Sequence, residues 1–310
     1  MANPKIIFSL HITLLLLLLQ GCSSTISVSR EINYPSAKGL NIHSITLDRF
    51  SSNQNSGADT LRQQIIANLN RDQFVSVVPE GGEGVLTARL QWDDLRHDSW
   101  REEHRYKDRI SYSYHLKLQR SLTVNYRLTT PDGEVGDAIS DTFSEEYQSS
   151  ESQRQANSKA PTNNEIDLQL LRHIATRIAR DIAPHRAAYA FEFHKGKDDN
   201  LELGIRYVEK GRNEQAEAIF QQVLQRSPKN EDRAAALYNL GLLQEIAGRY
   251  NEAFVHYRDA NQMNLKETLY LDALSRIERR VDEEAMFQKQ TQQVSPNSDI
   301  DERHKPAENE

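Results

Sequence analysis

Residues 203–228 read LGIRYVEKGRNEQAEAIFQQVLQRSP, and residues 240–263 repeat the pattern as LGLLQEIAGRYNEAFVHYRDANQM. The two stretches share a leucine–glycine pair, a central glycine, an alanine and an aromatic residue: Leu203-Gly204 with Leu240-Gly241, Gly211 with Gly248, Ala216 with Ala253, and Phe220 with Tyr257. Small residues let two helices approach closely, a central glycine suits the left-handed backbone that ends a helix, and the aromatic ring fills the space between helices. An internal repeat of this kind predicts stacked helical hairpins.

This pattern resembles the tetratricopeptide repeat, which also closes on a proline, here Pro228. The resemblance implies an all-α domain of helical hairpins, and we place it at residues 197–287. Residues 268–287 supply a third helical stretch without the leucine–glycine pair, which we interpret as a degenerate repeat or a cap. Each hairpin leaves an apolar face open, so repeats need neighbours or caps.

Members of this repeat family bind peptides or proteins along the concave face of their first helices. By repeat position, the partner-binding candidates are Leu201, Ile205, Val208, Tyr238, Asn239, Leu242, Glu245 and Ile246. Asn239 has a counterpart in the family's clamp for carboxylates, whereas the basic residues of that clamp are missing. Two alternatives stay open: the face binds a partner, or it packs on the first domain of the same chain. Likewise, Asn239 either contacts a ligand or bonds local backbone.

A second pattern occupies residues 110–128, where apolar side chains fall on even positions and polar ones on odd positions. Alternation held this long is typical of a β-strand with one covered face. Arg120 interrupts the apolar side, so we expect a bend or bulge there. Residues 166–182 instead place isoleucine or leucine every four residues, which predicts an amphipathic helix. We therefore predict an α+β domain at residues 40–193, with an antiparallel-rich sheet and flanking helices.

Residues 40–182 resemble, in element order, the small domain shared by curli-secretion lipoproteins and lipoprotein activators of penicillin-binding proteins. An alternative hypothesis treats residues 110–147 as a β-hairpin that inserts into a membrane, in a subunit of a secretion pore. We favour the covered strand, because Arg120 breaks the apolar face and the return strand carries Asp141 and Glu145 in register with its apolar residues.

Three polar stretches connect or flank these domains. Residues 22–39 are predicted to be a tether, residues 149–165 a mobile loop, and residues 288–310 a disordered tail with two prolines.

The chain starts with Lys5 and a short apolar run, which is typical of a secretory signal over residues 1–21. Leu19-Gln20-Gly21-Cys22 follows and resembles the lipobox of bacterial lipoproteins. The resemblance implies that Cys22 carries acyl chains such as palmitate and anchors the protein to a membrane. Ser23, in place of aspartate, implies the periplasmic face of the outer membrane of a Gram-negative cell. The alternative is an ordinary signal peptide with an incidental cysteine.

Composition argues against several classes of function. A formal net charge of −7 argues against nucleic-acid binding. The ten histidines show no metal-ligand spacing, and no nucleophile or phosphate-loop motif occurs. Asp94 and His97 could be imagined in a metal site, but alternation sends them to different faces. We therefore predict no enzyme activity, cofactor, metal or small-molecule substrate, and hypothesise a protein-interaction scaffold or adaptor in envelope assembly.

Overall fold

A computed structural model describes residues 25–54 and 57–292. The predicted signal segment, Cys22 and residues 293–310 lie outside the described residues. The chain divides into two compact units, which are treated separately below. The repeat unit comprises Met1–Ile32 and Ala187–Glu284, and the sheet unit comprises Asn33–Arg186 and Ala285–Glu310. In the described part of the chain, no helix is long and apolar enough to cross a lipid bilayer.

The sheet unit is built on one long strand, β6 (Arg109–Thr130). Strands β3 (Ser76–Val77), β2 (Ser44–Ser52) and β4 (Gly84–Trp92) lead to one edge of β6, and β5 (Arg96–Tyr106) continues along that edge. Strand β7 (Gly133–Ser149) pairs with the opposite edge over its whole length. The pairs β2–β3 and β2–β4 are parallel and the others are antiparallel, so the predicted α+β class with an antiparallel-rich sheet is confirmed.

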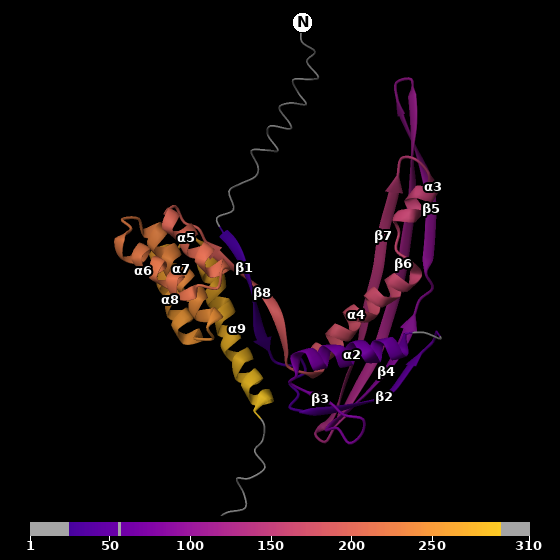
Figure 1. The fold of residues 1–310 in the computed structure, drawn as a ribbon, viewed down its shortest axis with the longest axis horizontal. Helices are drawn as coiled ribbons and strands as arrows, with labels where there is room; N and C mark the ends of the chain where they lie inside the picture. Colours follow the sequence, from indigo (N-terminus) through magenta and orange to yellow (C-terminus); the bar gives the residue numbers. More distant parts are fainter. Residues whose placement is uncertain (1–24, 55–56, 293–310) are drawn as a thin grey trace, which may run out of the picture. The chain divides into compact units, whose positions relative to one another are not determined.

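Two helices, α2 (Ala58–Asp72) and α4 (Asn163–Ile182), cover one face of this sheet (Figure 1). A capping box starts α4, because Thr162 and Glu165 exchange side-chain and backbone hydrogen bonds. The helix buries the predicted stripe of Ile166, Leu170, Ile174, Ile178 and Ile182. These side chains pack with the even-numbered side of β6, namely Leu116, Leu118, Leu122, Val124, Tyr126 and Leu128.

Of the bend or bulge expected near Arg120, a bulge is absent from the β6–β7 pairing, since its register is unbroken from residue 114 to residue 130. What changes near Arg120 is the partner on the other edge, which passes from β4 to β5. The positive charge of Arg120 is balanced by Asp167 of α4, because Arg120 Nε lies 2.7 Å from Asp167 Oδ1. The guanidinium also lies over the Trp92 ring, 4.7 Å from its centre. A buried charge thus persists because it is paired.

This arrangement argues against the membrane-hairpin alternative along most of β6, although Ile110 near the tip of the β5–β6 hairpin is 54% exposed. From Leu116 to Leu128, the apolar side of β6 that would enter a membrane already packs with α2 and α4. Its odd-numbered side carries serine, threonine, asparagine and charged residues, which a bilayer interior disfavours.

Two of the predicted flexible stretches contain regular structure. Helix α3 (Gln153–Lys159) lies within the segment expected to be a mobile loop, and the Ser152 side chain caps its first turn. Strand β1 (Thr25–Tyr34) occupies most of the segment expected to be a tether. Helix α3 has Ala156 as its only apolar residue, whereas β1 alternates apolar and polar residues and packs Val28 into the core of the repeat unit. Contacts distant in sequence stabilise both elements. Helix α9 (Thr268–Thr291) likewise extends into the start of the expected tail.

The repeat unit contains the helices α5 (Asp199–Glu209), α6 (Asn213–Arg226), α7 (Asn230–Ile246), α8 (Tyr250–Met263) and the first part of α9 (Figure 1). Gly211 and Gly248 end the first helix of each hairpin with φ of 72° and 74°, as the repeat pattern predicts. A Cβ on Gly204 would collide with the Phe220 ring, and one on Gly241 would collide with Tyr257. Close helix packing therefore requires glycine at both places.

The unit also contains a two-stranded sheet that the sequence analysis did not predict. Strand β1 pairs with β8 (His185–His194), which directly precedes α5 in the chain. The Arg30 side chain donates a hydrogen bond to the Val208 carbonyl, which ties β1 to the end of α5. The first domain was expected to extend to residue 193, but the unit boundary falls between Arg186 and Ala187. Residues 187–194 therefore belong with the helices.

Candidate functional site

The predicted partner-binding face exists in the repeat unit, but its side chains are covered. Leu201, Ile205, Val208, Tyr238, Asn239 and Leu242 are each 0% exposed. Glu245 is 4% exposed, and Ile246 is half-buried. The expectation of a face available to a partner therefore needs correction, because another part of the same chain already lies against it.

Strand β8 is the segment that lies on this face. The Asn239 side chain accepts a hydrogen bond from the His194 amide through Oδ1 (2.9 Å) and donates one to the His194 carbonyl through Nδ2 (2.8 Å). From the preceding residue of α7, the Tyr238 hydroxyl donates at 3.0 Å to the carbonyl of Glu192, two residues before His194 in β8. A side-chain amide that bonds both backbone groups of one residue fixes the position and register of that strand.

The open alternatives are thus decided in part. The face packs within its own chain, although on residues 187–194 rather than on the sheet unit. Asn239 bonds backbone, as one of its two interpretations expected, and that backbone is 45 residues away in sequence.

Aromatic side chains of β8 complete the packing. Alternation along the strand puts Tyr189, Phe191 and Phe193 on one side, and Phe191 and Phe193 are almost fully buried. Phe193 stacks near Phe220 of α6, with ring centres 6.4 Å apart. Fully burying a phenylalanine side chain stabilises a fold by about 1.5–3 kcal/mol. The strand is therefore part of the hydrophobic core of the repeat unit.

A buried ion pair links α9 to the predicted binding face on α7. The Arg276 guanidinium contacts both carboxylate oxygens of Glu245, at 3.1 Å and 2.9 Å. The Tyr257 hydroxyl donates to the same carboxylate at 2.5 Å, and burial raises the pKa of Tyr257 well above its usual range. Glu245 was predicted to face a partner, but its carboxylate is fully engaged by these two side chains.

His194 ends the strand in a polar pocket between α7 and α9. Its Nδ1 lies 2.7 Å from the Tyr270 hydroxyl, and its Nε2 lies 4.0 Å from Glu267. Burial lowers the pKa of His194, and the charges of Glu267 and Asp232 oppose this shift only in part. The imidazole is therefore held in its neutral form, in which one nitrogen can accept and the other donate.

The sequence analysis did not predict β8 or the contacts that Tyr270 and Arg276 of α9 make with this face. A signal was present, because residues 188–194 read AYAFEFH and alternate in the manner of a strand. The side chains of Tyr270 and Arg276 were harder to find, because the third helical stretch lacks the repeat pattern that would have aligned it.

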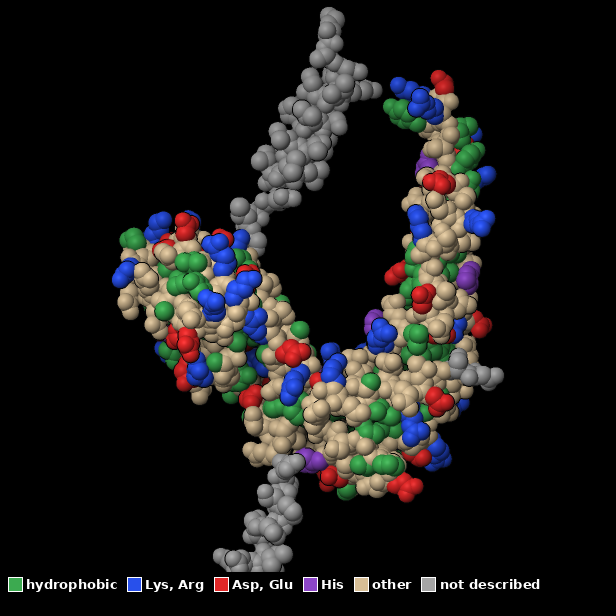
Figure 2. Space-filling view, in the orientation of Figure 1, with side chains coloured by type: hydrophobic (Ala, Val, Ile, Leu, Met, Phe, Trp, Pro, Cys, Tyr) green, Lys and Arg blue, Asp and Glu red, His purple; other side chains and the backbone are tan. Residues whose placement is uncertain are grey.

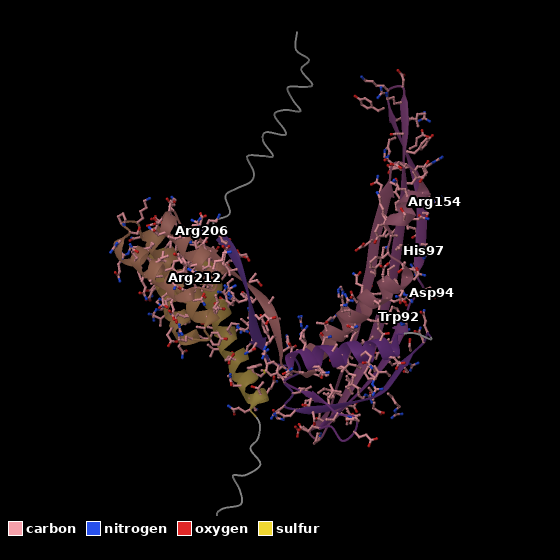
Figure 3. The ribbon with its side chains drawn as sticks, in the orientation of Figure 1. Trp92, Asp94, His97, Arg154, Arg206 and Arg212 are labelled. Atoms are coloured by element: carbon pink, nitrogen blue, oxygen red, sulfur yellow. The ribbon has the colours of Figure 1, made fainter. Side chains whose placement is uncertain are left out.

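The sequence analysis singled out Asp94 and His97 as residues that could be imagined in a metal site. Asp94 and His97 are exposed near the β4–β5 connection (Figure 3). No group of three histidine, cysteine, aspartate or glutamate side chains in the described residues could hold a metal ion.

One polar cluster in the sheet unit does resemble a catalytic relay in its connections. His115 lies 2.7 Å from Glu146 through Nδ1 and 2.8 Å from the Ser113 hydroxyl through Nε2. However, Ser113 is only 4% exposed, and His104 Nε2 lies 2.8 Å from the Ser113 hydroxyl oxygen. The covered Ser113 hydroxyl has no room for an acyl substrate. We therefore interpret the cluster as a set of hydrogen bonds that link β5, β6 and β7.

Comparison with known proteins identifies the repeat. Residues 200–264 match the family model described as tetratricopeptide repeat. This repeat is a non-catalytic protein-interaction module, and no enzymatic family is indicated. No curated protein matches the chain.

Solved structures give only weak likenesses. A minor lipoprotein from Acinetobacter baumannii is 15% identical with a TM-score of 0.25, over 48% of this chain and 98% of that one. A PelC dodecamer from Paraburkholderia phytofirmans is 10% identical with a TM-score of 0.21, over 50% of this chain and 98% of that one. A structure described as a putative neuraminyllactose-binding hemagglutinin homolog from Helicobacter pylori is 15% identical with a TM-score of 0.28, over 48% of this chain and 89% of that one. Scores this low carry no argument about function, and the resemblance to curli-secretion lipoproteins stays a prediction.

Replacing Asn239 with alanine tests the contact between β8 and α7. The change leaves the buried His194 amide and carbonyl without partners, so we expect the free energy of unfolding to fall by about 1–3 kcal/mol. Urea unfolding followed by circular dichroism at helical wavelengths measures the effect. Gln222→Ala on the exposed side of α6 is the matched control and should change little. An unchanged midpoint for Asn239→Ala would contradict the clamp.

The neutral state of His194 predicts a pH dependence. Unfolding restores a normal pKa of about 6.5, so the unfolded chain binds more protons than the folded one below that pH. The free energy of unfolding should be steady above about pH 6.5 and should fall as the pH is lowered. His194→Gln should make this fall shallower in urea unfolding at several pH values, whereas His97→Gln, at an exposed site, should not. Equal slopes for His194→Gln and the parent protein would refute the assignment.

Proposed function

We propose that this protein is a lipoprotein acylated at Cys22, held at the periplasmic face of the outer membrane, and that it acts as a protein-interaction scaffold in envelope assembly. The observation that carries the proposal is the pair of tetratricopeptide repeats at residues 200–264. The lipobox-like sequence before Cys22 supports the anchor, and Ser23 supports the outer membrane. Peptidoglycan-synthesis and secretion machinery are the partner classes that the predicted resemblance of residues 40–182 favours.

Because β8 fills the usual binding face, we place the partner contact on the outer surface of α5. Leu203 is 39% exposed there, and it lines a cavity of about 650 Å³ with Arg206, Tyr207, Glu209, Lys210 and Arg212. Arg206 and Arg212 are both exposed, and Figure 3 labels them among the helices of the repeat unit. Apolar side chains bordered by cationic ones suit a partner segment that carries both apolar and acidic residues.

The rest of this surface is mixed in character. On the face of the repeat unit seen in Figure 2, basic and acidic side chains are interspersed with scattered hydrophobic ones. Isolated apolar side chains are normal on a protein surface, so the α5 cavity is distinguished by the combination of Leu203, Tyr207 and three cations.

In-cell photocrosslinking tests the proposal. A photoreactive amino acid at Leu203 should capture envelope proteins, because that side chain is exposed, whereas the same amino acid at the buried Leu242 should yield only intramolecular products. Mass spectrometry identifies the products. Partner capture from Leu242 but not from Leu203 would mean that β8 leaves the groove and that the α5 site is wrong.

The anchor is tested in the same strain. Cys22→Ser should move the protein from the membrane fraction to the soluble fraction and abolish labelling by a fatty-acid analogue. It should also weaken crosslinking at Leu203, because the protein is no longer concentrated near membrane-bound partners. Undiminished fatty-acid labelling of Cys22→Ser would refute acylation at Cys22, and retention of the unlabelled variant in the membrane fraction would refute Cys22 as the anchor.

A further inference from the structure

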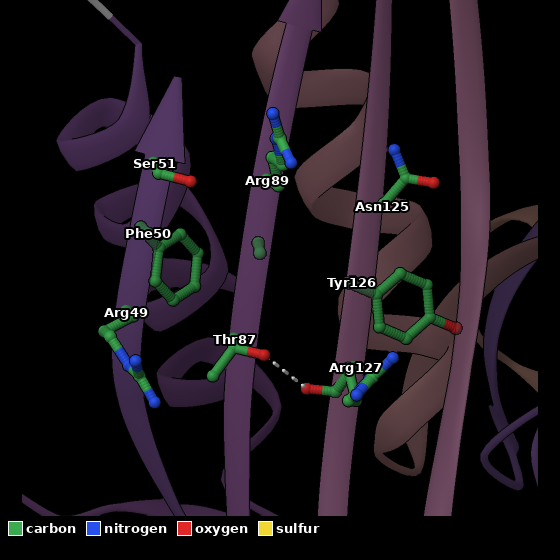
Figure 4. Close-up of a pocket in the computed structure, with 9 residues that line it drawn as sticks. Arg49, Phe50, Ser51, Thr87, Arg89, Asn125, Tyr126 and Arg127 are labelled. Carbon is green, nitrogen blue, oxygen red and sulfur yellow. Dashed lines mark hydrogen bonds between the residues drawn. The ribbon is translucent and has the colours of Figure 1, made fainter. Parts of the chain in front are cut away.

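Three arginines from three neighbouring strands border one cavity in the sheet unit. Arg49 comes from β2, Arg89 from β4 and Arg127 from β6, and the cavity measures about 540 Å³. Figure 4 shows the three side chains above the same stretch of sheet. Thr87 and Arg89 alternate with the buried Leu86 and Leu90, so they lie on the face opposite the one that packs on α2 and α4.

The local charge is unlike that of the chain as a whole, which has a formal net charge of −7. Arg89 has no ion-pair partner among the residues that the structure describes. Arg49 meets Asp48 at 3.4 Å and Arg127 meets Glu134 at 2.7 Å, with the two arginine side chains 89% and 65% exposed. Exposed pairs of this kind contribute little stability, so both arginines can turn to an incoming anion.

Neutral hydrogen-bonding groups lie among the arginines, and Phe50, Ala88 and Tyr126 complete the lining. Ser51, Arg89 and Asn125 lie in one row across β2, β4 and β6, and Thr87 lies opposite Arg127 in the next row. The Thr87 hydroxyl is 3.4 Å from the Arg127 carbonyl, a long contact that leaves the hydroxyl able to bond a ligand (Figure 4). The outward side chains of these two rows are therefore cationic or hydrogen-bonding.

We propose that this cavity is a binding site for a soluble ligand that carries two linked phosphate groups. A guanidinium offers a rigid fork of donors that matches phosphate oxygens two at a time. Arg89 and Arg127 are diagonal neighbours on β4 and β6, a spacing of about 7–8 Å, so their long side chains can converge and each reach one of two joined phosphates. The volume exceeds what the phosphates need, and Ser51, Thr87 and Asn125 suit a polar, hydroxyl-bearing remainder. This proposal is independent of the scaffold function.

The probe is inorganic pyrophosphate, titrated calorimetrically into the purified full chain. Saturable binding that weakens as salt is added is expected, because exposed charges are screened. Arg89→Gln should weaken binding about tenfold or more, since it removes charge-assisted hydrogen bonds. Arg127→Gln should act in the same direction. Glu134→Gln should instead strengthen binding, because it frees Arg127 from its carboxylate.

Arg154→Gln is the matched control, because Arg154 is an exposed arginine on α3, away from the cavity lining. It should bind pyrophosphate like the parent protein, and circular dichroism should report the same fold for every variant. The proposal is overturned if pyrophosphate does not bind, if Arg89→Gln and Arg127→Gln bind normally, or if Arg154→Gln loses as much affinity. Arg89-dependent binding of phosphatidylglycerol vesicles without pyrophosphate binding would also overturn it, in favour of a lipid headgroup.

Discussion

The paired hydrogen bonds between Asn239 and the backbone of His194 are the constraint on which the repeat unit depends. The end of β8 around Phe191, Phe193 and His194 is buried, so its amides and carbonyls must find partners in the protein. Asn239 provides both partners at the end of β8, and Tyr238 provides one at Glu192. With the strand fixed in this way, its phenylalanine side chains enter the core and His194 reaches Tyr270.

This constraint changes what the repeats can do. In this family the concave face usually receives a peptide, and here a segment of the chain itself takes that place through backbone contacts. The binding face thereby becomes part of the core, and Glu245 becomes half of a buried ion pair with Arg276. Displacing β8 would leave the buried backbone groups of His194 unpaired and would expose Phe191 and Phe193, which destabilises the open form. A partner can therefore bind a surface outside the groove, such as the one around Leu203, without the free-energy cost of displacing β8.

Local spacing predicted much of the fold. Gly204, Gly211 and their repeats predicted the helical hairpins because each glycine answers a local steric need, and alternation predicted β6. The occupant of the groove, the partner of Arg120 and the cluster of arginines were not predictable, because each joins residues far apart in the chain. Strand β1 and helix α3 were predicted to be flexible because contacts with distant residues hold them in place, whereas β8 was missed although its alternation is visible in the sequence.

Amide hydrogen exchange at His194 tests the central claim most directly, because this amide donates to Asn239 rather than to a neighbouring strand. If β8 is a fixed part of the repeat unit, the amide should exchange as slowly as the amides in the middle of α7. A slowing of about a thousandfold or more corresponds to an opening free energy of about 4 kcal/mol. Exchange at the rate of an unstructured peptide, while α7 stays protected, would show that the groove is open and would contradict this account.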